Sequence, residues 1–107
     1  MTLPTQLVLQ VLLEQPSQEL YGLQIGSQAG LASGTIHPIL ARLEAVGWLT
    51  SRWEDSDRAH QQGRPRRRYY QLSQEGCSQA PVALARAKAR RNALRGMSLN
   101  LPGEAHA

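Results

Sequence analysis

Residues 33–53 read SGTIHPILARLEAVGWLTSRW, and the spacing of their apolar side chains changes at the glycine in the middle. Before Gly47, apolar residues recur every three or four positions, which predicts a helix buried along one face. We expect Ser33 to cap the start of this helix and Gly47 to end it. After Gly47, apolar and polar residues alternate, so Trp48–Trp53 is predicted as a half-buried strand.

Two further helices are expected before this one. The first runs from Pro4 to about Glu14 and stops at the Gln-Pro pair that follows, because a residue before proline avoids helical backbone angles. The second runs from Glu19 to about Ala29, and Gly30 stands where a glycine commonly ends a helix. A short AGLAS connection joins the second helix to the third, and this pair is typical of a helix-turn-helix.

The chain returns along a hairpin after the strand. Residues 54–63, EDSDRAHQQG, are polar without periodicity and are predicted as a loop. Residues 66–72, RRRYYQL, are predicted as the second strand, with Tyr70 and Leu72 on one face. A helix-turn-helix followed by such a hairpin predicts a winged helix, a fold that is mainly α with a small β-hairpin (α+β).

A last helix follows the hairpin. Ser73 is expected to cap it, although Pro81 also allows a start near Ala80. The expected layout is a winged helix-turn-helix over residues 1–76, a C-terminal dimerisation helix over 77–97 and a flexible tail over 98–107. With 107 residues, 41% of them hydrophobic, the chain has enough material for one modest core.

Charge is concentrated in one part of the chain. Residues 58–95 contain ten basic residues and one acid, whereas residues 1–57 contain two basic residues and six acids. Eleven of the twelve basic residues are arginine, which suits bidentate recognition of phosphate and guanine. This asymmetry favours a nucleic-acid partner over an anionic membrane surface. No apolar run approaches the roughly 18 residues of a membrane-spanning helix.

Three blocks in order along the chain resemble the PadR family of bacterial winged-helix transcriptional regulators. They are LYGLQI at 20–25, SGTIHPILARLEAVGWL at 33–49 and GRPRRRYYQLSQEG at 63–76. The resemblance implies a homodimeric repressor that occupies a pseudo-palindromic operator in double-stranded DNA. The chain differs from the family pattern at His37, where tyrosine is usual, in the short loop before the third helix, and in a brief, polar last helix.

Nine residues are candidates for contact with DNA. They are Ser33, Thr35, His37, Pro38 and Arg42 on the third helix, and Arg64, Arg66, Arg67 and Arg68 on the hairpin. The start of a recognition helix reads base edges in the major groove, which assigns such contacts to Thr35 and His37. Proline stiffens the turn after Arg64 and suits its insertion into a minor groove. Since neighbouring residues of a strand face opposite ways, at least one of the three consecutive arginines is expected to lie along the sheet or to pair with an acid such as Glu54. The alternative is that Ser33 only caps its helix and that His37 only packs against the neighbouring one.

The first helix indicates self-association. Its apolar side chains face almost every direction, so one side can pack in the core while another faces a second subunit. The expected dimer contacts are Leu7 and Val11 of the first helix and Leu84, Ala87 and Leu94 of the last.

Other function classes lack a signature in the sequence. No Ser/His/Asp set, carboxylate pair, phosphate-binding glycine loop or metal-ligand spacing is present, so we expect no enzyme, no cofactor and no metal. The single cysteine, Cys77, excludes an internal disulfide and fits a cytoplasmic, nucleoid-associated protein. Two alternatives remain: a sensor whose DNA binding is released by a small aromatic effector, and a winged helix that binds only protein. A last helix without aromatic residues gives no support for an effector pocket, and the basic hairpin argues against a purely protein-binding role.

Overall fold

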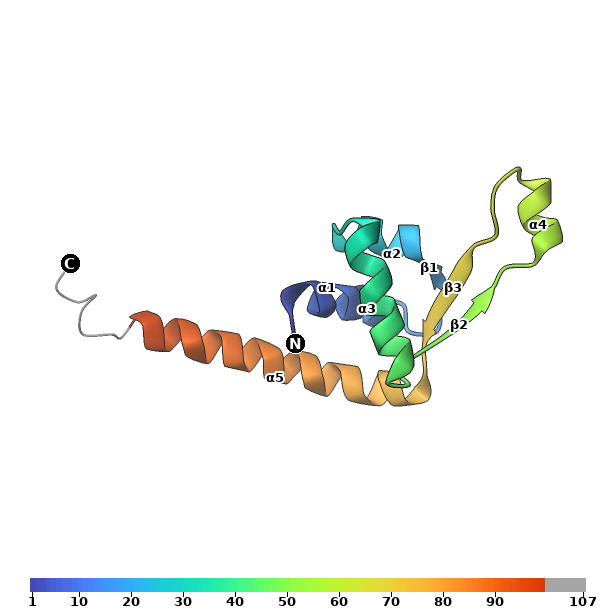
Figure 1. Cartoon of the computed structure of the whole chain (residues 1–107). Coiled ribbons are helices and arrows are strands. Elements are labelled where there is room, and N and C mark those ends of the chain that lie inside the picture. Colours follow the sequence, from blue (N-terminus) through green and yellow to red (C-terminus); the bar gives the residue numbers. More distant parts are fainter. Residues whose placement is uncertain (100–107) are drawn as a thin grey trace.

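The protein has a helical body, a β-hairpin that projects from it and a long C-terminal helix (Figure 1). The structure, a computed structural model, describes residues 1–99. In chain order its elements are α1 (Leu3–Glu14), β1 (Leu20–Tyr21), α2 (Gly22–Ala29), α3 (Ser33–Ala45), β2 (Leu49–Trp53), α4 (Ser56–Gln61), β3 (Arg68–Leu72) and α5 (Gln74–Leu99). This mainly helical architecture with a small antiparallel sheet confirms the winged-helix prediction.

Helix α1 supplies much of the core. It packs against α2, α3 and α5, and its Val8, Leu9 and Leu12 are at most 1% exposed. These neighbours explain why α1 is apolar in almost every direction without a second subunit. Val11, which was expected at a dimer contact, is also buried within the subunit, at 5% exposure. Leu7 is half-buried and is the α1 candidate that keeps an accessible surface.

The sheet contains a strand that the sequence did not reveal. Its order is β1-β3-β2, all antiparallel. A helix was expected from Glu19, but Leu20 and Tyr21 form β1 against β3, and α2 begins only at Gly22. A strand of two residues is too short for alternation to appear, and Leu20 suits an apolar helical position equally well.

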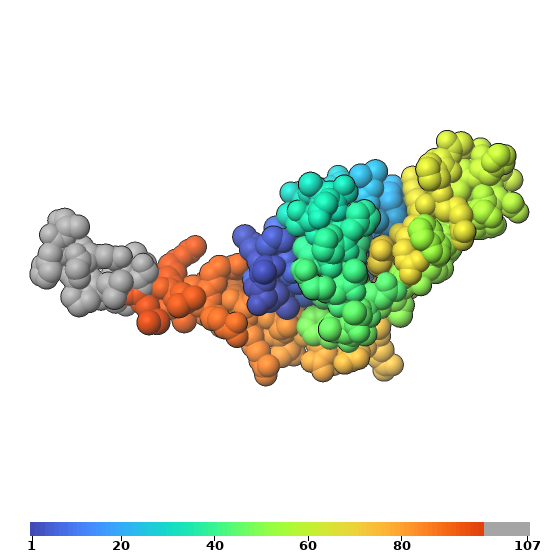
Figure 2. Space-filling view, viewed as in Figure 1, coloured from blue at the N-terminus to red at the C-terminus, as the bar shows by residue number. Residues whose placement is uncertain are grey.

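Strands β2 and β3 form the predicted hairpin. Leu49 lies opposite Leu72, and Ser51 lies opposite Tyr70. Tyr70 and Leu72, which were predicted to share one face of the strand, are both buried. Away from the helical body the hairpin leaves the core, and Trp53 at the end of β2 is 52% exposed. Figure 2 shows the hairpin projecting at the end of the molecule opposite to the far end of α5.

The tip of the hairpin holds a short helix where a loop was predicted. Asp55 caps α4 by accepting from the backbone N–H of Asp57 at 3.1 Å. Gly63 closes the turn after it with φ +66°, a left-handed value that favours glycine. One apolar side chain of α4, Ala59, is buried, at 2% exposure. A helix this short needs no repeating apolar pattern, so the periodicity gave no signal.

Two cap predictions had opposite outcomes. The Ser73 hydroxyl accepts from the N–H of Gly76 at 3.0 Å, which confirms it as a cap for α5. The later start near Ala80 is wrong, since α5 begins at Gln74 and is longer at both ends than the predicted 77–97. Ser33 does not cap α3: Ala32 has the extended cap backbone, no side chain bonds the free N–H groups, and Ser33 is already helical.

The expected tail over 98–107 overlaps the last residues of α5, and residues 100–107 lie outside the described part of the chain.

Candidate nucleic-acid interface

Helix α3 has one buried face and one polar face. Its buried residues are Ile36, Ile39, Leu40 and Leu43. Its exposed residues include the five candidates Ser33, Thr35, His37, Pro38 and Arg42. Gly47 follows the helix with φ +85° and turns the chain into β2, as predicted. The apolar face therefore fixes the helix on the core, and the polar face is left for a partner.

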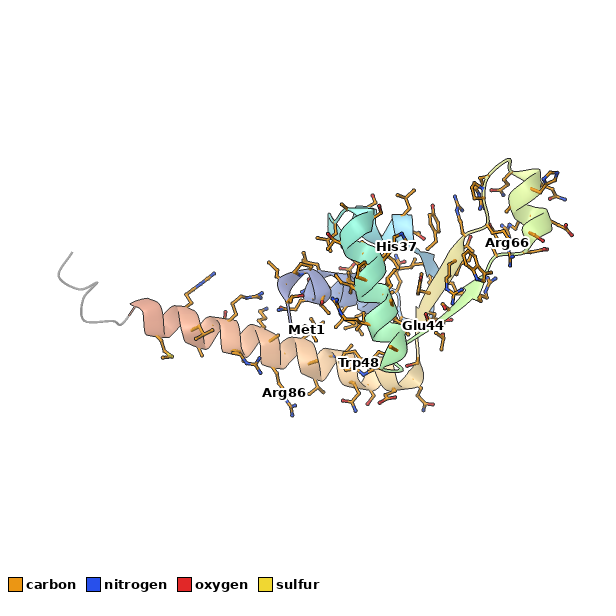
Figure 3. The ribbon with its side chains drawn as sticks, viewed as in Figure 1. Met1, His37, Glu44, Trp48, Arg66 and Arg86 are labelled. Carbon is orange, nitrogen blue, oxygen red and sulfur yellow. The ribbon has the colours of Figure 1, made fainter. Side chains whose placement is uncertain are left out.

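A hollow of about 320 Å³ lies between α3 and the hairpin. It is lined by His37 from α3, by Tyr21, Gly22 and Leu23, and by Trp53, Arg66, Arg67, Arg68 and Tyr70 from the hairpin. In Figure 3, His37 is carried by α3 and Arg66 by the hairpin. A Cβ on Gly22 would stand 3.3 Å from Cε1 of His37, so glycine leaves room for the ring. The imidazole thus packs beside α2 and also stays exposed to a partner.

Glu54 anchors the tip of the hairpin. Although it is charged, it is only 3% exposed. The Arg64 guanidinium donates to both carboxylate oxygens, at 2.5 Å to Oε1 and 2.8 Å to Oε2. The backbone N–H of Arg67 and the hydroxyl of Tyr69 also donate to the carboxylate, each at 3.3 Å. The Arg64 hydrogen bonds, against the opposing effect of burial, lower the pKa of Glu54 to about 2.

Arg64 therefore has a partner within the subunit. Its side chain is 20% exposed and also donates to Oε1 of Gln62, at 3.1 and 3.2 Å. The sequence suggested that Arg64 reaches into a minor groove and that an arginine of 66–68 pairs with Glu54. In the structure, the arginine that pairs with Glu54 is Arg64 itself. Its insertion into DNA would require this buried carboxylate to lose its main partner.

The three consecutive arginines lie against aromatic rings. The guanidinium carbons of Arg66 and Arg68 lie 5.5 and 5.1 Å from the ring centre of Trp53. The guanidinium carbon of Arg67 lies 4.0 Å from the ring centre of Tyr21. These distances are within the range of cation–π attraction. The contacts hold the side chains without cancelling their charge.

Sequence reasoning missed some residues of this surface. Trp53 was predicted only as part of a half-buried strand, and Tyr21 was placed inside a helix. Glu44, near the end of α3, accepts from the Ser51 hydroxyl and lies 3.8 Å from Nη2 of Arg68. No local sequence pattern marks these residues, because each contacts residues of another element that only the fold brings close. The cross-strand position of Trp53 opposite Arg68 follows once the hairpin register is known.

A second hollow, of about 300 Å³, lies between α1 and α5. It is lined by Met1, Leu3, Gln6, Ala87, Arg90, Arg91 and Leu94. Of the three α5 candidates for dimer contact, Leu84 is half-buried against the core, Ala87 is 9% exposed and Leu94 is 60% exposed. Leu94 is therefore the candidate with the largest uncovered apolar surface.

Neither a metal site nor a membrane helix was found in the described part of the chain. Within residues 1–99, no three His, Cys, Asp or Glu side chains are grouped to hold a metal ion. Over the same residues, no helix combines the length and the hydropathy needed to span a bilayer.

Comparison with known proteins gives a family match for the chain. The model of the transcriptional regulator PadR-like family matches residues 8–80. A comparison with curated proteins gave no match. Among solved structures, a Streptococcus mutans protein has 24% sequence identity and a TM-score of 0.68, over 92% of this chain and 88% of that chain. A PadR family transcriptional regulator from Eggerthella lenta has 23% identity and a TM-score of 0.67, over 90% and 84%. The PcaV transcriptional regulator from Streptomyces coelicolor, solved with its natural ligand, has 25% identity and a TM-score of 0.66, over 99% and 67%.

The family match covers well over half of the chain and includes α3, the whole hairpin and the start of α5. The solved structures share the fold over most of the described residues. Proteins of this family regulate transcription by binding DNA and are not enzymes, which agrees with an exposed, arginine-rich surface. The chain belongs to the PadR-like family of DNA-binding transcriptional regulators.

Proposed function

We propose that this protein represses transcription by binding a pseudo-palindromic operator in double-stranded DNA as a homodimer. The observation that carries the proposal is the hollow between α3 and the hairpin, where His37 stands beside three arginines. A concave, positive surface of this shape fits the sugar-phosphate backbone between the two grooves of DNA. In this arrangement α3 lies in the major groove and the hairpin reaches the adjacent minor groove.

The start of α3 reads the sequence. Thr35 offers a hydroxyl and a methyl group to base edges, and His37 offers a ring nitrogen. Ser33 and Pro38 border the same end of the helix, with the Ser33 hydroxyl placed for a phosphate. Arg42 lies about two turns along α3 and contacts the DNA backbone rather than bases.

The hairpin supplies affinity through Arg66, Arg67 and Arg68. These side chains line the hollow and present positive charge to phosphates, with that of Arg68 partly offset by Glu44 at 3.8 Å. Arg64 contributes indirectly, because its pair with Glu54 fixes the tip that carries them. This assigns Arg64 a supporting role instead of the minor-groove contact that the sequence suggested.

The homodimer forms through the uncovered parts of α1 and α5. Met1, Leu3, Leu94 and Met97 are between 45% and 65% exposed, although all four are large and apolar. A second copy of the chain would bury this surface and would space two recognition helices for a two-fold operator. Leu7, Leu84 and Ala87 border the same seam. A repressor of this kind acts in the cytoplasm, on the nucleoid.

Fluorescence anisotropy tests the proposal directly. A labelled fragment from the gene's own promoter is compared with a scrambled fragment of equal length. We expect tighter binding to the promoter, and we expect Thr35→Ala to reduce this preference. Thr50→Ala is the matched control, since Thr50 is exposed on β2 outside the hollow. Equal affinity of the wild-type protein for both fragments would rule out sequence-specific recognition of that promoter.

Repression is tested separately from binding. A reporter under the same promoter is measured with wild-type protein and with Thr35→Ala. The proposal requires lower expression with the wild-type protein and partial recovery with the variant. Higher expression with the wild-type protein would identify an activator instead.

A further inference from the structure

Trp53 has an unusual place for a large aromatic side chain. It ends β2 and is 52% exposed, whereas Trp48 packs against the core. In the hairpin register Trp53 stands directly opposite Arg68. The guanidinium carbon of Arg68 lies 5.1 Å from the ring centre, and that of Arg66 lies 5.5 Å away. One exposed indole therefore contacts two of the arginines that line the hollow.

Each of these arginines is also held at a second point. Nε of Arg66 donates to the backbone oxygen of Glu54 at 2.9 Å, a bond that uses neither of the two terminal nitrogens. Nη2 of Arg68 lies 3.8 Å from the Glu44 carboxylate on α3. An indole face on one side and an oxygen on the other restrict the rotation of two long, flexible side chains.

The hairpin thus holds arginines in two chemically different ways. Arg64 is held by a carboxylate, and the pair has no net charge to offer a phosphate. Arg66 and Arg68 lie against an indole, which attracts a cation through its quadrupole and carries no charge. Arg68 also lies 3.8 Å from the Glu44 carboxylate, a longer pair than that of Arg64 and Glu54. The positive charge of Arg66 remains available at the hollow, and Glu44 offsets only part of that of Arg68. An acid in place of Trp53 would fix them equally well and cancel that charge.

We propose that Trp53 is a positioning residue for DNA binding, which holds the guanidinium groups of Arg66 and Arg68 ready to bind phosphates. The proposal rests on the DNA-binding function proposed above. Because ordering of the two arginines precedes binding, less conformational entropy is lost when the complex forms. Trp53 acts through the arginines and needs no contact of its own with DNA.

Substitution of Trp53 tests whether its aromatic ring contributes to DNA affinity. Trp53→Leu keeps an apolar side chain and removes the aromatic face. We expect it to weaken binding to the promoter fragment by about tenfold, because two long side chains then have to be ordered when the complex forms. Trp53→Phe retains a weaker aromatic face and should restore part of the loss. A thermal melt of each variant shows whether the fold is kept. If Trp53→Leu is unfolded, the affinity of Trp53→Phe is compared with that of the wild-type protein instead.

A double-mutant cycle tests whether Trp53 acts through these arginines. In an Arg66→Ala/Arg68→Ala background, Trp53→Leu should cause no further loss of affinity. In an Arg67→Ala background, the loss of about tenfold should remain, because Arg67 lies against Tyr21 instead. This background is the control, since it also removes positive charge from the hollow but keeps both arginines that contact Trp53.

The outcomes separate this proposal from the function on which it rests. Binding by the wild-type protein and loss with Arg66→Ala/Arg68→Ala support the proposed function alone. Two further results would show that Trp53 is not a positioning residue. One is that Trp53→Leu binds DNA as tightly as the wild-type protein. The other is that Trp53→Leu lowers the affinity equally in the Arg66→Ala/Arg68→Ala and Arg67→Ala backgrounds. Equal losses with Trp53→Phe and Trp53→Leu also overturn the proposal. Absence of wild-type binding overturns both.

Discussion

Arg64 and Glu54 form a two-point ion pair across the tip of the hairpin, with nitrogen–oxygen distances of 2.5 and 2.8 Å. The carboxylate is 3% exposed, and the backbone N–H of Arg67 and the Tyr69 hydroxyl donate to it as well. The pair connects the end of β2 to the segment that leads into β3. It makes Arg64 part of the framework that places the neighbouring arginines.

Stability should depend on the charge of Glu54. Its pKa of about 2 in the folded protein lies below the ordinary value of 4.5, so the charged form stabilises the fold. This contribution is fully present above pH 4.5 and is lost as the pH falls toward about 2. We expect the wild-type protein to have a higher unfolding midpoint than Glu54→Gln at pH 7, with the difference vanishing near pH 2. Urea unfolding of both proteins across this range measures it, and a difference that is constant with pH would contradict the assignment.

Arg64→Ala should lower the melting temperature, because it leaves a buried carboxylate without its main partner. The double variant Arg64→Ala/Glu54→Ala should recover part of the loss, since it removes the unpaired charge. Arg58→Ala is the control: Arg58 is exposed on α4, and its loss should change stability by less than about 0.5 kcal/mol. Thermal unfolding monitored by circular dichroism compares the four proteins. A wild-type melting temperature for Arg64→Ala would mean that the pair does not support the hairpin.

Gly76 lies where α5 passes close to the backbone just before β2. A Cβ there would lie 2.1 Å from the carbonyl oxygen of Trp48. We expect Gly76→Ala to destabilise the protein by about 3 kcal/mol, because backbone has to move. Gly34→Ala is the matched control within α3. A Cβ there would meet no neighbouring element within 4 Å, so the change should be neutral or stabilising by up to about 1 kcal/mol. Urea unfolding gives both values, and similar results for the two variants would disprove the close contact.

The proposed dimer depends on apolar surface that the subunit leaves uncovered. Leu94→Lys places a charge in the hollow between α1 and α5, among residues that already carry positive charge. We expect it to yield folded monomers at concentrations where the wild-type protein is dimeric. Val46→Lys is the control, since Val46 is also 60% exposed but lies at the end of α3. Sedimentation velocity at tens of micromolar would contradict the proposal if the wild-type protein is monomeric.

Much of the fold could be predicted because the deciding signals are local. The apolar stripe of α3, the glycine after it and the alternation in β3 each lie within a few residues. β1 and α4 could not be predicted in this way. β1 exists because β3 offers an unpaired edge to Leu20 and Tyr21. α4 is held by a cap at Asp55 and one buried alanine, which is too little to form a pattern.

The candidate site was less predictable than the fold. Its charge was evident from the arginine run, but the partner of each arginine depends on the hairpin register. That register brings Trp53 opposite Arg68 and brings Glu54 within reach of Arg64. The same residue type therefore has a structural role at Arg64 and an exposed one at Arg66, a difference that the sequence alone does not contain.

The salt dependence of promoter binding tests the central claim most directly, that the hairpin arginines neutralise DNA phosphates. Anisotropy titrations between about 50 and 200 mM salt give the slope of log affinity against log salt concentration. If three arginines of each subunit bind phosphates, wild-type affinity should fall by about a thousandfold over this range. Arg66→Ala should lower the slope by about 1 for each subunit bound, while Arg58→Ala should leave it unchanged. A flat wild-type slope, or an equal slope for Arg66→Ala, would show that these arginines do not bind DNA.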